Sequence, residues 1–140
     1  MTAIMVVDSS FIVSALLDSS TADGAWAESE LLKCAHVVAP HLLYPETANQ
    51  LRKHVLRGTI SEDVAHLAYR ELLRLPLDLL HFEPAAERVW ELRHNVTPYD
   101  AWYVALAEQL GAPLATLDLR LVKATGPTCA FHTPVLSIET

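Results

Sequence analysis

Short apolar runs alternate with longer segments of helical periodicity along this chain. Residues 4–7, Ile-Met-Val-Val, are wholly apolar, which is typical of a strand covered on both faces. Similar runs predict further strands at residues 37–38, 77–82, 114–117 and 135–138. Between the strands, apolar residues recur every three or four positions. This spacing predicts helices at residues 11–17, 24–35, 41–57, 84–94 and 99–110, one that opens at residues 61–63 and a short one from residue 120.

The residues at the ends of these segments support the assignment. Ser9 or Ser10 can cap the first helix. Gly58 stands where the 41–57 helix would end, and Pro84 suits a first helical turn. Strands that alternate with helices indicate parallel β-α units. We therefore expect an α/β fold with a small central parallel sheet flanked by helices on both faces.

Composition and charge narrow the class of protein. The chain has 140 residues, 51% apolar and 19% charged, which predicts a single packed domain over residues 1–140. Its net charge of -7 argues against holding nucleic acid mainly by bulk positive charge. Two cysteines, Cys34 and Cys129, indicate a reducing cytosol. With no signal-peptide pattern and no apolar stretch of about 20 residues, we expect a cytoplasmic protein outside the membrane.

Four carboxylates stand where predicted strands end or predicted helices begin. Asp8 and Asp118 each follow a strand directly. Glu46 and Asp100 lie near the beginnings of helices. Each acid alone can be a helix-capping residue. However, the carboxyl ends of parallel strands share one edge of a sheet, so Asp8 and Asp118 are expected on one rim, where α/β proteins bind ligands.

Carboxylates that converge without a basic partner repel one another and raise their pKa values. A hard divalent cation such as Mg²⁺ removes that conflict, because it prefers oxygen ligands. The pattern therefore favours an acidic metal site of Asp8, Asp100 and Asp118, with Glu46 bound directly or through water. Asn49 lies one helical turn after Glu46 and would contact substrate, a metal-bound water or only solvent.

Four short motifs occur in order along nearly the whole chain. They are Val-Val-Asp-Ser-Ser at 6–10, Pro-Glu-Thr-Ala-Asn-Gln-Leu at 45–51, Tyr-Asp-Ala-Trp-Tyr-Val-Ala-Leu-Ala-Glu at 99–108 and Thr-Leu-Asp at 116–118. Together they resemble the successive motifs of PIN-domain nucleases. Their order and the chain length are most similar to the VapC-type toxins of bacterial toxin–antitoxin pairs.

The resemblance implies a metal-dependent endoribonuclease. It implies Mg²⁺, with Mn²⁺ as a possible substitute, and hydrolysis of RNA by metal-activated water that leaves a 5′-phosphate and a 3′-hydroxyl. The implied metal ligands and catalytic residues are Asp8, Glu46, Asp100 and Asp118. The hydroxyls of Ser10 and Thr116 would lie near the metal. The resemblance further implies a homodimer and a cognate antitoxin protein as partner.

One residue departs from the family pattern. Pro45 directly precedes Glu46. If this helix begins at Pro40, a proline at position 45 would kink the helix or delay its start to Tyr44. The exact placement of Glu46 therefore depends on where the helix begins.

The helix that carries Glu46 also carries the densest basic stretch. Arg52, Lys53 and Arg57 would contact RNA phosphates, or they would form a solvated helix face. The helical hairpin over residues 41–75 is amphipathic. It would bind the partner chains or simply cover the sheet, through Leu67, Tyr69, Leu72 and Leu75.

Two other classes of function compete with the nuclease. A phosphohydrolase with Asp8 as covalent nucleophile would want a second aspartate two positions on, and Ser10 stands there. A receiver domain would need a lysine in a fixed place after a late strand, and no lysine stands in that place. The alternative outside the enzyme class is a catalytically inactive PIN-like protein-binding or regulatory module. Such a module would be expected to lack one or more of the four acids.

Overall fold

Five parallel strands lie in the order β3-β2-β1-β4-β5 in the computed structural model, which describes residues 3–134. Val6 of the central strand pairs with Val38 on one side and with Leu114 on the other. The strands are β1 (Ile4–Val7), β2 (His36–Pro40), β3 (Leu77–Leu80), β4 (Leu114–Ala115) and β5 (Phe131–His132). The predicted strand at residues 135–138 lies outside the described residues.

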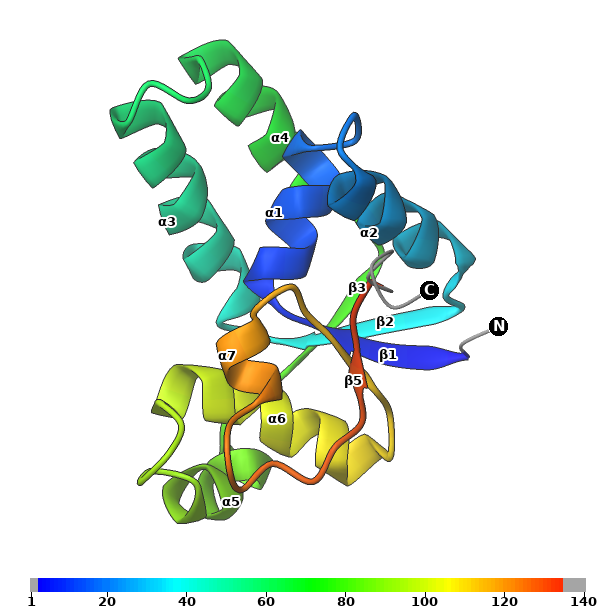
Figure 1. Cartoon of the computed structure of the whole chain (residues 1–140), viewed down its shortest axis with the longest axis vertical. Coiled ribbons are helices and arrows are strands. Elements are labelled where there is room, and N and C mark those ends of the chain that lie inside the picture. The colour runs from blue at the N-terminus through cyan, green and yellow to red at the C-terminus, as the bar shows by residue number, and fades with distance from the viewer. Residues whose placement is uncertain (1–2, 135–140) are drawn as a thin grey trace.

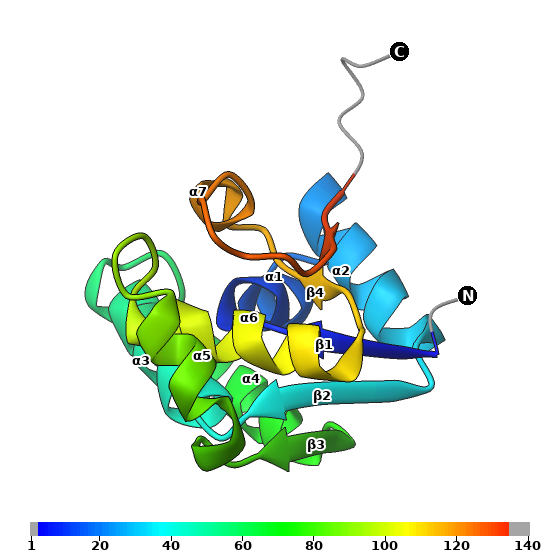
Figure 2. The ribbon, with the colours of Figure 1, turned by 90° about the horizontal axis from the view of Figure 1, so that it is seen from below.

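Helices flank the sheet on both sides, which confirms the predicted α/β class (Figures 1 and 2). Figure 1 shows α1 and α2 on one side and α5 and α6 on the other, while α3 and α4 form a hairpin beside them. The described helices are α1 (Ser9–Leu17), α2 (Ala22–Lys33), α3 (Leu43–Leu56), α4 (Glu62–Arg74), α5 (Ala86–Glu91), α6 (Pro98–Leu110) and α7 (Leu119–Val122), with a 3₁₀ turn η1 (Glu83–Ala85). No described helix is long and apolar enough to cross a membrane.

Several helix boundaries differ from the prediction by one to three residues. Asp8, and not Ser9 or Ser10, caps α1, because its carboxylate accepts from the backbone N–H of Phe11 at 3.0 Å. Pro84 lies in η1, and α5 follows only at Ala86 and ends at Glu91 rather than near residue 94.

The third shift concerns α3, which begins at Leu43 and so makes Pro45 a first-turn residue. The first N–H groups of a helix have no intrahelical acceptor, so a proline there removes no hydrogen bond. Glu46 follows with regular helical bonding, because its N–H donates to Leu42 O at 3.0 Å. The predicted glycine cap is also present, since Gly58 has a φ of 76° directly after the helix.

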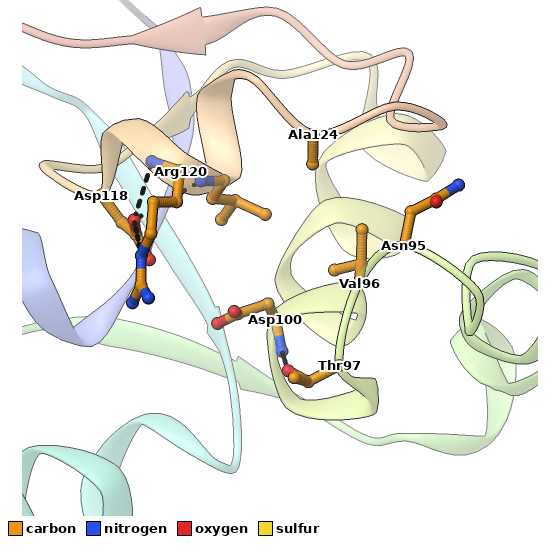
Figure 3. Close-up of a pocket in the computed structure, with 8 residues that line it drawn as sticks. Asn95, Val96, Thr97, Asp100, Asp118, Arg120 and Ala124 are labelled. Carbon is orange, nitrogen blue, oxygen red and sulfur yellow. Dashed lines mark hydrogen bonds and ion pairs between the residues drawn. The ribbon is translucent and has the colours of Figure 1, made fainter.

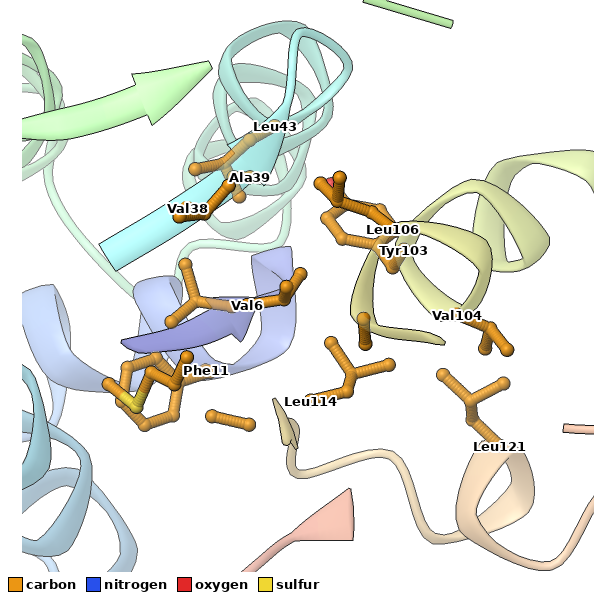
Figure 4. Packing of buried hydrophobic residues seen from close by; sticks show 14 of the residues in the cluster. Val6, Phe11, Val38, Ala39, Leu43, Tyr103, Val104, Leu106, Leu114 and Leu121 are labelled. Carbon is orange, nitrogen blue, oxygen red and sulfur yellow. The ribbon is translucent and has the colours of Figure 1, made fainter. Parts of the chain in front are cut away.

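The core fills both sides of β1. Figure 4 shows Phe11 of α1 on one side of Val6 and Tyr103 and Val104 of α6 on the other. All four of these side chains are fully buried. Where α2 begins, only glycine fits: a Cβ on Gly24 would lie 1.9 Å from the backbone oxygen of Asp18. Apolar burial on both faces of the sheet therefore sets the positions of the helices that carry the polar residues.

Polar contacts from Arg88 and Glu108 hold the segment after α7 against helices α5 and α6. Arg88 of α5 donates through Nε to Glu108 Oε1 at 2.7 Å and through Nη2 to the backbone oxygen of Gly126 at 2.9 Å. Glu108 of α6 also accepts from the N–H of Thr128 at 2.8 Å. These bonds hold residues 126–128 against α5 and α6, and so fix the end of the segment that begins with α7.

Candidate active site

The four predicted acids come from four elements that end or begin at the carboxyl edge of the sheet. Asp8 follows β1, and Asp118 lies between β4 and α7. Asp100 lies in the first turn of α6, and Glu46 in the first turn of α3. Their charges act on one another: the negative charges of Glu46 and Asp118 raise the pKa of Asp100, and that of Asp100 raises the pKa of Asp8. These electrostatic effects place Asp100 near each of the other three acids.

Asp8 is a buried carboxylate with three hydrogen-bond donors. Its side chain accepts from Ser10 Oγ at 2.7 Å, from the N–H of Phe11 at 3.0 Å and from the hydroxyl of Thr116. Removal from water raises the pKa of Asp8 from 3.8 to about 6, and these donors only partly oppose that shift. Charge at this position is therefore costly unless a cation approaches.

The two predicted hydroxyl residues link Asp8 to the chain around Asp118. Ser10 Oγ accepts from the N–H of Leu117 at 3.0 Å, and Thr116 Oγ1 accepts from the N–H of Asp118 at 3.0 Å. Ser10 and Thr116 also contact each other at 3.3 Å between their oxygens. Because both hydroxyls also donate to Asp8, they fix its distance from the loop that presents Asp118.

Asp100 and Asp118 line a pocket of about 240 Å³. In Figure 3 the carboxylate of Asp100 extends from α6 toward Asp118 and Arg120. Partial burial, followed by the nearby carboxylates, raises the pKa of Asp100. Asp118 is held differently, because it caps α7 by accepting from the N–H groups of Arg120 at 3.0 Å and Leu121 at 3.4 Å.

Glu46 is held by a residue that the sequence did not suggest as functional. The hydroxyl of Tyr103 donates to Glu46 Oε1 at 2.8 Å. Burial and then the charge of Glu46 raise the pKa of Tyr103 well above its ordinary value, so the phenol remains a donor. The available signal was the position of Tyr103 one helical turn after Asp100, which places both on one side of α6. Gln50 was also missed, and it donates to Ser9 Oγ at 2.6 Å.

The remaining predicted residues make no hydrogen bond or ion pair with the acids within residues 3–134. Asn49 is exposed and makes no side-chain hydrogen bond within residues 3–134. Arg52, Lys53 and Arg57 are exposed on or just after α3, and within residues 3–134 none of the three forms an ion pair. Their roles toward substrate stay predictions.

The donor set fits a hard divalent cation. It consists of carboxylate oxygens, one of them buried, and carboxylates and water are the ligands that Mg²⁺ prefers. Within residues 3–134 the only ion pair to these acids is the one from Arg120 Nε to Asp118 at 3.8 Å, and the Arg120 side chain is 96% exposed. In that part of the chain, no group of three or more His, Cys, Asp or Glu side chains lies close enough together to hold a metal ion. The metal site itself stays a prediction.

Comparisons with known proteins agree with this fold and these motifs. Residues 5–127 match the sequence profile of the PIN domain. Ribonuclease VapC1 of Mycobacterium tuberculosis is 43% identical over 125 residues, which are 89% of this chain and 92% of that protein. Ribonuclease VapC3 of Pyrobaculum aerophilum is 35% identical over 85% of this chain and 92% of its own.

Solved structures show the same fold at low sequence identity. The crystal structure of Mycobacterium tuberculosis VapC20, a toxin that cleaves the sarcin-ricin loop, has a TM-score of 0.68 at 19% identity and covers 93% of this chain and 99% of that one. VapBC-5 of the same organism, from the VapBC family of toxin–antitoxin systems, has a TM-score of 0.54 at 24% identity, over 93% and 99%. On these grounds the chain belongs to the PIN-domain family and, within it, to the VapC ribonucleases.

Proposed function

We propose that this protein is the toxin of a toxin–antitoxin pair and an endoribonuclease that hydrolyses RNA with Mg²⁺ or Mn²⁺ in the cytoplasm. The names of its relatives support the ribonuclease activity, and the VapC20 and VapBC-5 structures support the toxin assignment. The observation that carries the metal dependence is Asp8. It is buried beside Asp100, and no described basic side chain neutralises it.

Two of the four acids are held in place by neighbouring hydroxyl groups. Ser10 and Thr116 hold Asp8, and Tyr103 holds Glu46. A bound Mg²⁺ would supply an acidified water as the nucleophile and would neutralise charge on the phosphate. Attack of that water on phosphorus breaks the bond to the 3′ oxygen, so the products carry a 5′-phosphate and a 3′-hydroxyl.

Positive charge near the acids is confined to a few exposed side chains. Arg120 lies beside Asp118 at the pocket and is free to reach a phosphate oxygen. Lys53 lies seven residues after Glu46 on α3, which is about 10 Å along the helix axis. We assign phosphate contacts to Arg52, Lys53 and Arg57, which guide the RNA backbone while the acids act on one phosphodiester.

The α3–α4 hairpin is the proposed partner surface for a homodimer and for the antitoxin. It contains a groove of about 420 Å³ between the two helices. Tyr69 lines this groove and is 40% exposed, and Leu67 is exposed elsewhere on α4 at 61%. Leu72 is fully buried in the hydrophobic core and Leu75 packs against it half-buried, so the prediction of a partner surface is wrong for Leu72.

Cleavage of RNA with purified protein tests the proposed function. We expect cleavage with Mg²⁺ or Mn²⁺, none with EDTA, and none by Asp8→Asn or Asp100→Asn. Asp78→Asn is the matched control, because Asp78 is an exposed acid on β3. Full activity in both site variants would refute the assignment. An inactive parent that still binds an antitoxin would instead support the alternative, a regulatory PIN-like module.

A further inference from the structure

Two histidines outside the acidic site lie side by side on the same edge of the sheet. His41 directly follows β2 and His81 directly follows β3. Because Pro40 pairs with Leu80, the parallel register brings the next residue of each strand together. The N–H of His41 donates to Leu80 O at 3.1 Å. The two imidazole rings stack with centroids 4.8 Å apart and an interplanar angle of 29°.

This imidazole stack is next to the acids in the order of the sheet. β2 lies between β1, which presents Asp8, and β3. Neighbouring strands are about 4.8 Å apart, so the stack begins one strand away from Asp8. His41 also lies two residues before α3, the helix that presents Glu46 in its first turn. An RNA strand that places one phosphodiester at the acids therefore passes His41 and His81 if it follows the carboxyl edge toward β3.

A second ring pair, Phe82 with Trp102 of α6, follows the imidazole stack in the chain. Phe82, the residue after His81, is 40% exposed. Its ring meets that of Trp102 edge to face, with centroids 5.1 Å apart. Trp102 lies two residues after Asp100. Phe82 thus adds an exposed aromatic ring directly after His81 in the chain.

We propose that the His41–His81 stack is a stacking site for an unpaired base of the RNA substrate. The proposal rests on the proposed function. The neighbouring carboxylates repel phosphates, so the rings are suited to hold RNA through base faces rather than through the backbone. Base faces are accessible in single strands and covered in duplexes. Both histidines are exposed, so their stacking on each other buries little surface.

Binding of a fluorescein-labelled 12-nucleotide single-stranded RNA of mixed sequence, measured by anisotropy, tests the site. EDTA is present, so that a cation bridging the imidazoles does not contribute. Base stacking on aromatic side chains typically contributes about 1–3 kcal/mol per base, so the His41→Ala/His81→Ala double variant should bind roughly tenfold more weakly than the parent. His36→Ala is the matched control, because His36 is exposed at the other end of β2.

Three outcomes decide the proposal. The His41→Phe/His81→Phe variant should keep the affinity of the parent, because phenyl rings also stack, and an equal loss in both double variants would overturn the stacking site. Affinity of the alanine double variant within twofold of the parent would also overturn it. If the parent still cleaves RNA in that case, the proposed function stands without this site. A parent that neither cleaves nor binds RNA would overturn both proposals.

Discussion

Replacing Asp8 with asparagine should stabilise the metal-free protein while it abolishes cleavage. Asp8 is 6% exposed, and its burial raises the pKa of the carboxyl from 3.8 to about 6. One pKa unit corresponds to about 1.4 kcal/mol, so the ionised carboxylate costs the folded state about 3 kcal/mol at pH 7.5. Asparagine removes the charge, but its side chain has only one acceptor oxygen. The hydrogen-bond donors around Asp8 bond to both of its carboxylate oxygens. A lost hydrogen bond costs about 1 kcal/mol, and we expect a net gain of about 2 kcal/mol.

The pH dependence distinguishes a charge effect from improved packing. The pKa of Asp8 is higher in the folded state, so between pH 6 and 3.8 the folded protein binds more protons than the unfolded one. The penalty is complete above about pH 7 and declines as the pH falls through 6. By pH 5 it should be about half as large. The advantage of Asp8→Asn over the parent should therefore shrink by about 1.5 kcal/mol between pH 7.5 and pH 5.

Urea denaturation in EDTA at constant ionic strength measures this difference. Asp78→Asn is again the control, because Asp78 is exposed and should change the free energy of unfolding by less than about 0.5 kcal/mol. Addition of Mg²⁺ should stabilise the parent and leave Asp8→Asn almost unchanged, since only the folded parent would bind the ion. The reasoning is refuted if Asp8→Asn is less stable than the parent at pH 7.5, or if the gap is the same at pH 5.

Two further substitutions test the supports of the site. Tyr103→Phe removes the hydrogen bond to Glu46. It should lower the free energy of unfolding, measured by urea denaturation, by about 1.5 kcal/mol and should slow RNA cleavage. An unchanged cleavage rate would show that Tyr103 has only a structural role. Arg88→Met leaves Glu108 and Gly126 O without their donor and should lower the free energy of unfolding by about 2 kcal/mol. Arg70→Met is the control, because Arg70 is exposed on α4, and its free energy of unfolding should stay within about 0.5 kcal/mol of the parent. Equal effects of Arg88→Met and Arg70→Met would argue against the Arg88 contact.

Much of the fold and the positions of the acids along the chain followed from local patterns. The apolar run at residues 4–7 predicted the central strand, and the alternation of strands with helices predicted a parallel sheet. Parallel strands end on one edge, so Asp8 and Asp118 had to approach each other wherever the helices packed. Glu46 and Asp100 followed from their positions near the beginnings of helices, and the family motifs then supported all four acids. The inferences about the fold needed only hydrophobic period, chain order and the direction of the strands.

Only the tertiary structure decided which side chains support the acids and which other residues lie at the carboxyl edge of the sheet. The contact of Tyr103 with Glu46 joins residues 57 positions apart, and the stack of His41 on His81 depends on the register of β2 with β3. The burial that raises the pKa of Asp8 likewise comes from several elements at once. Periodicity is a local property that each segment carries by itself, whereas such contacts depend on how the apolar faces of separate elements pack together.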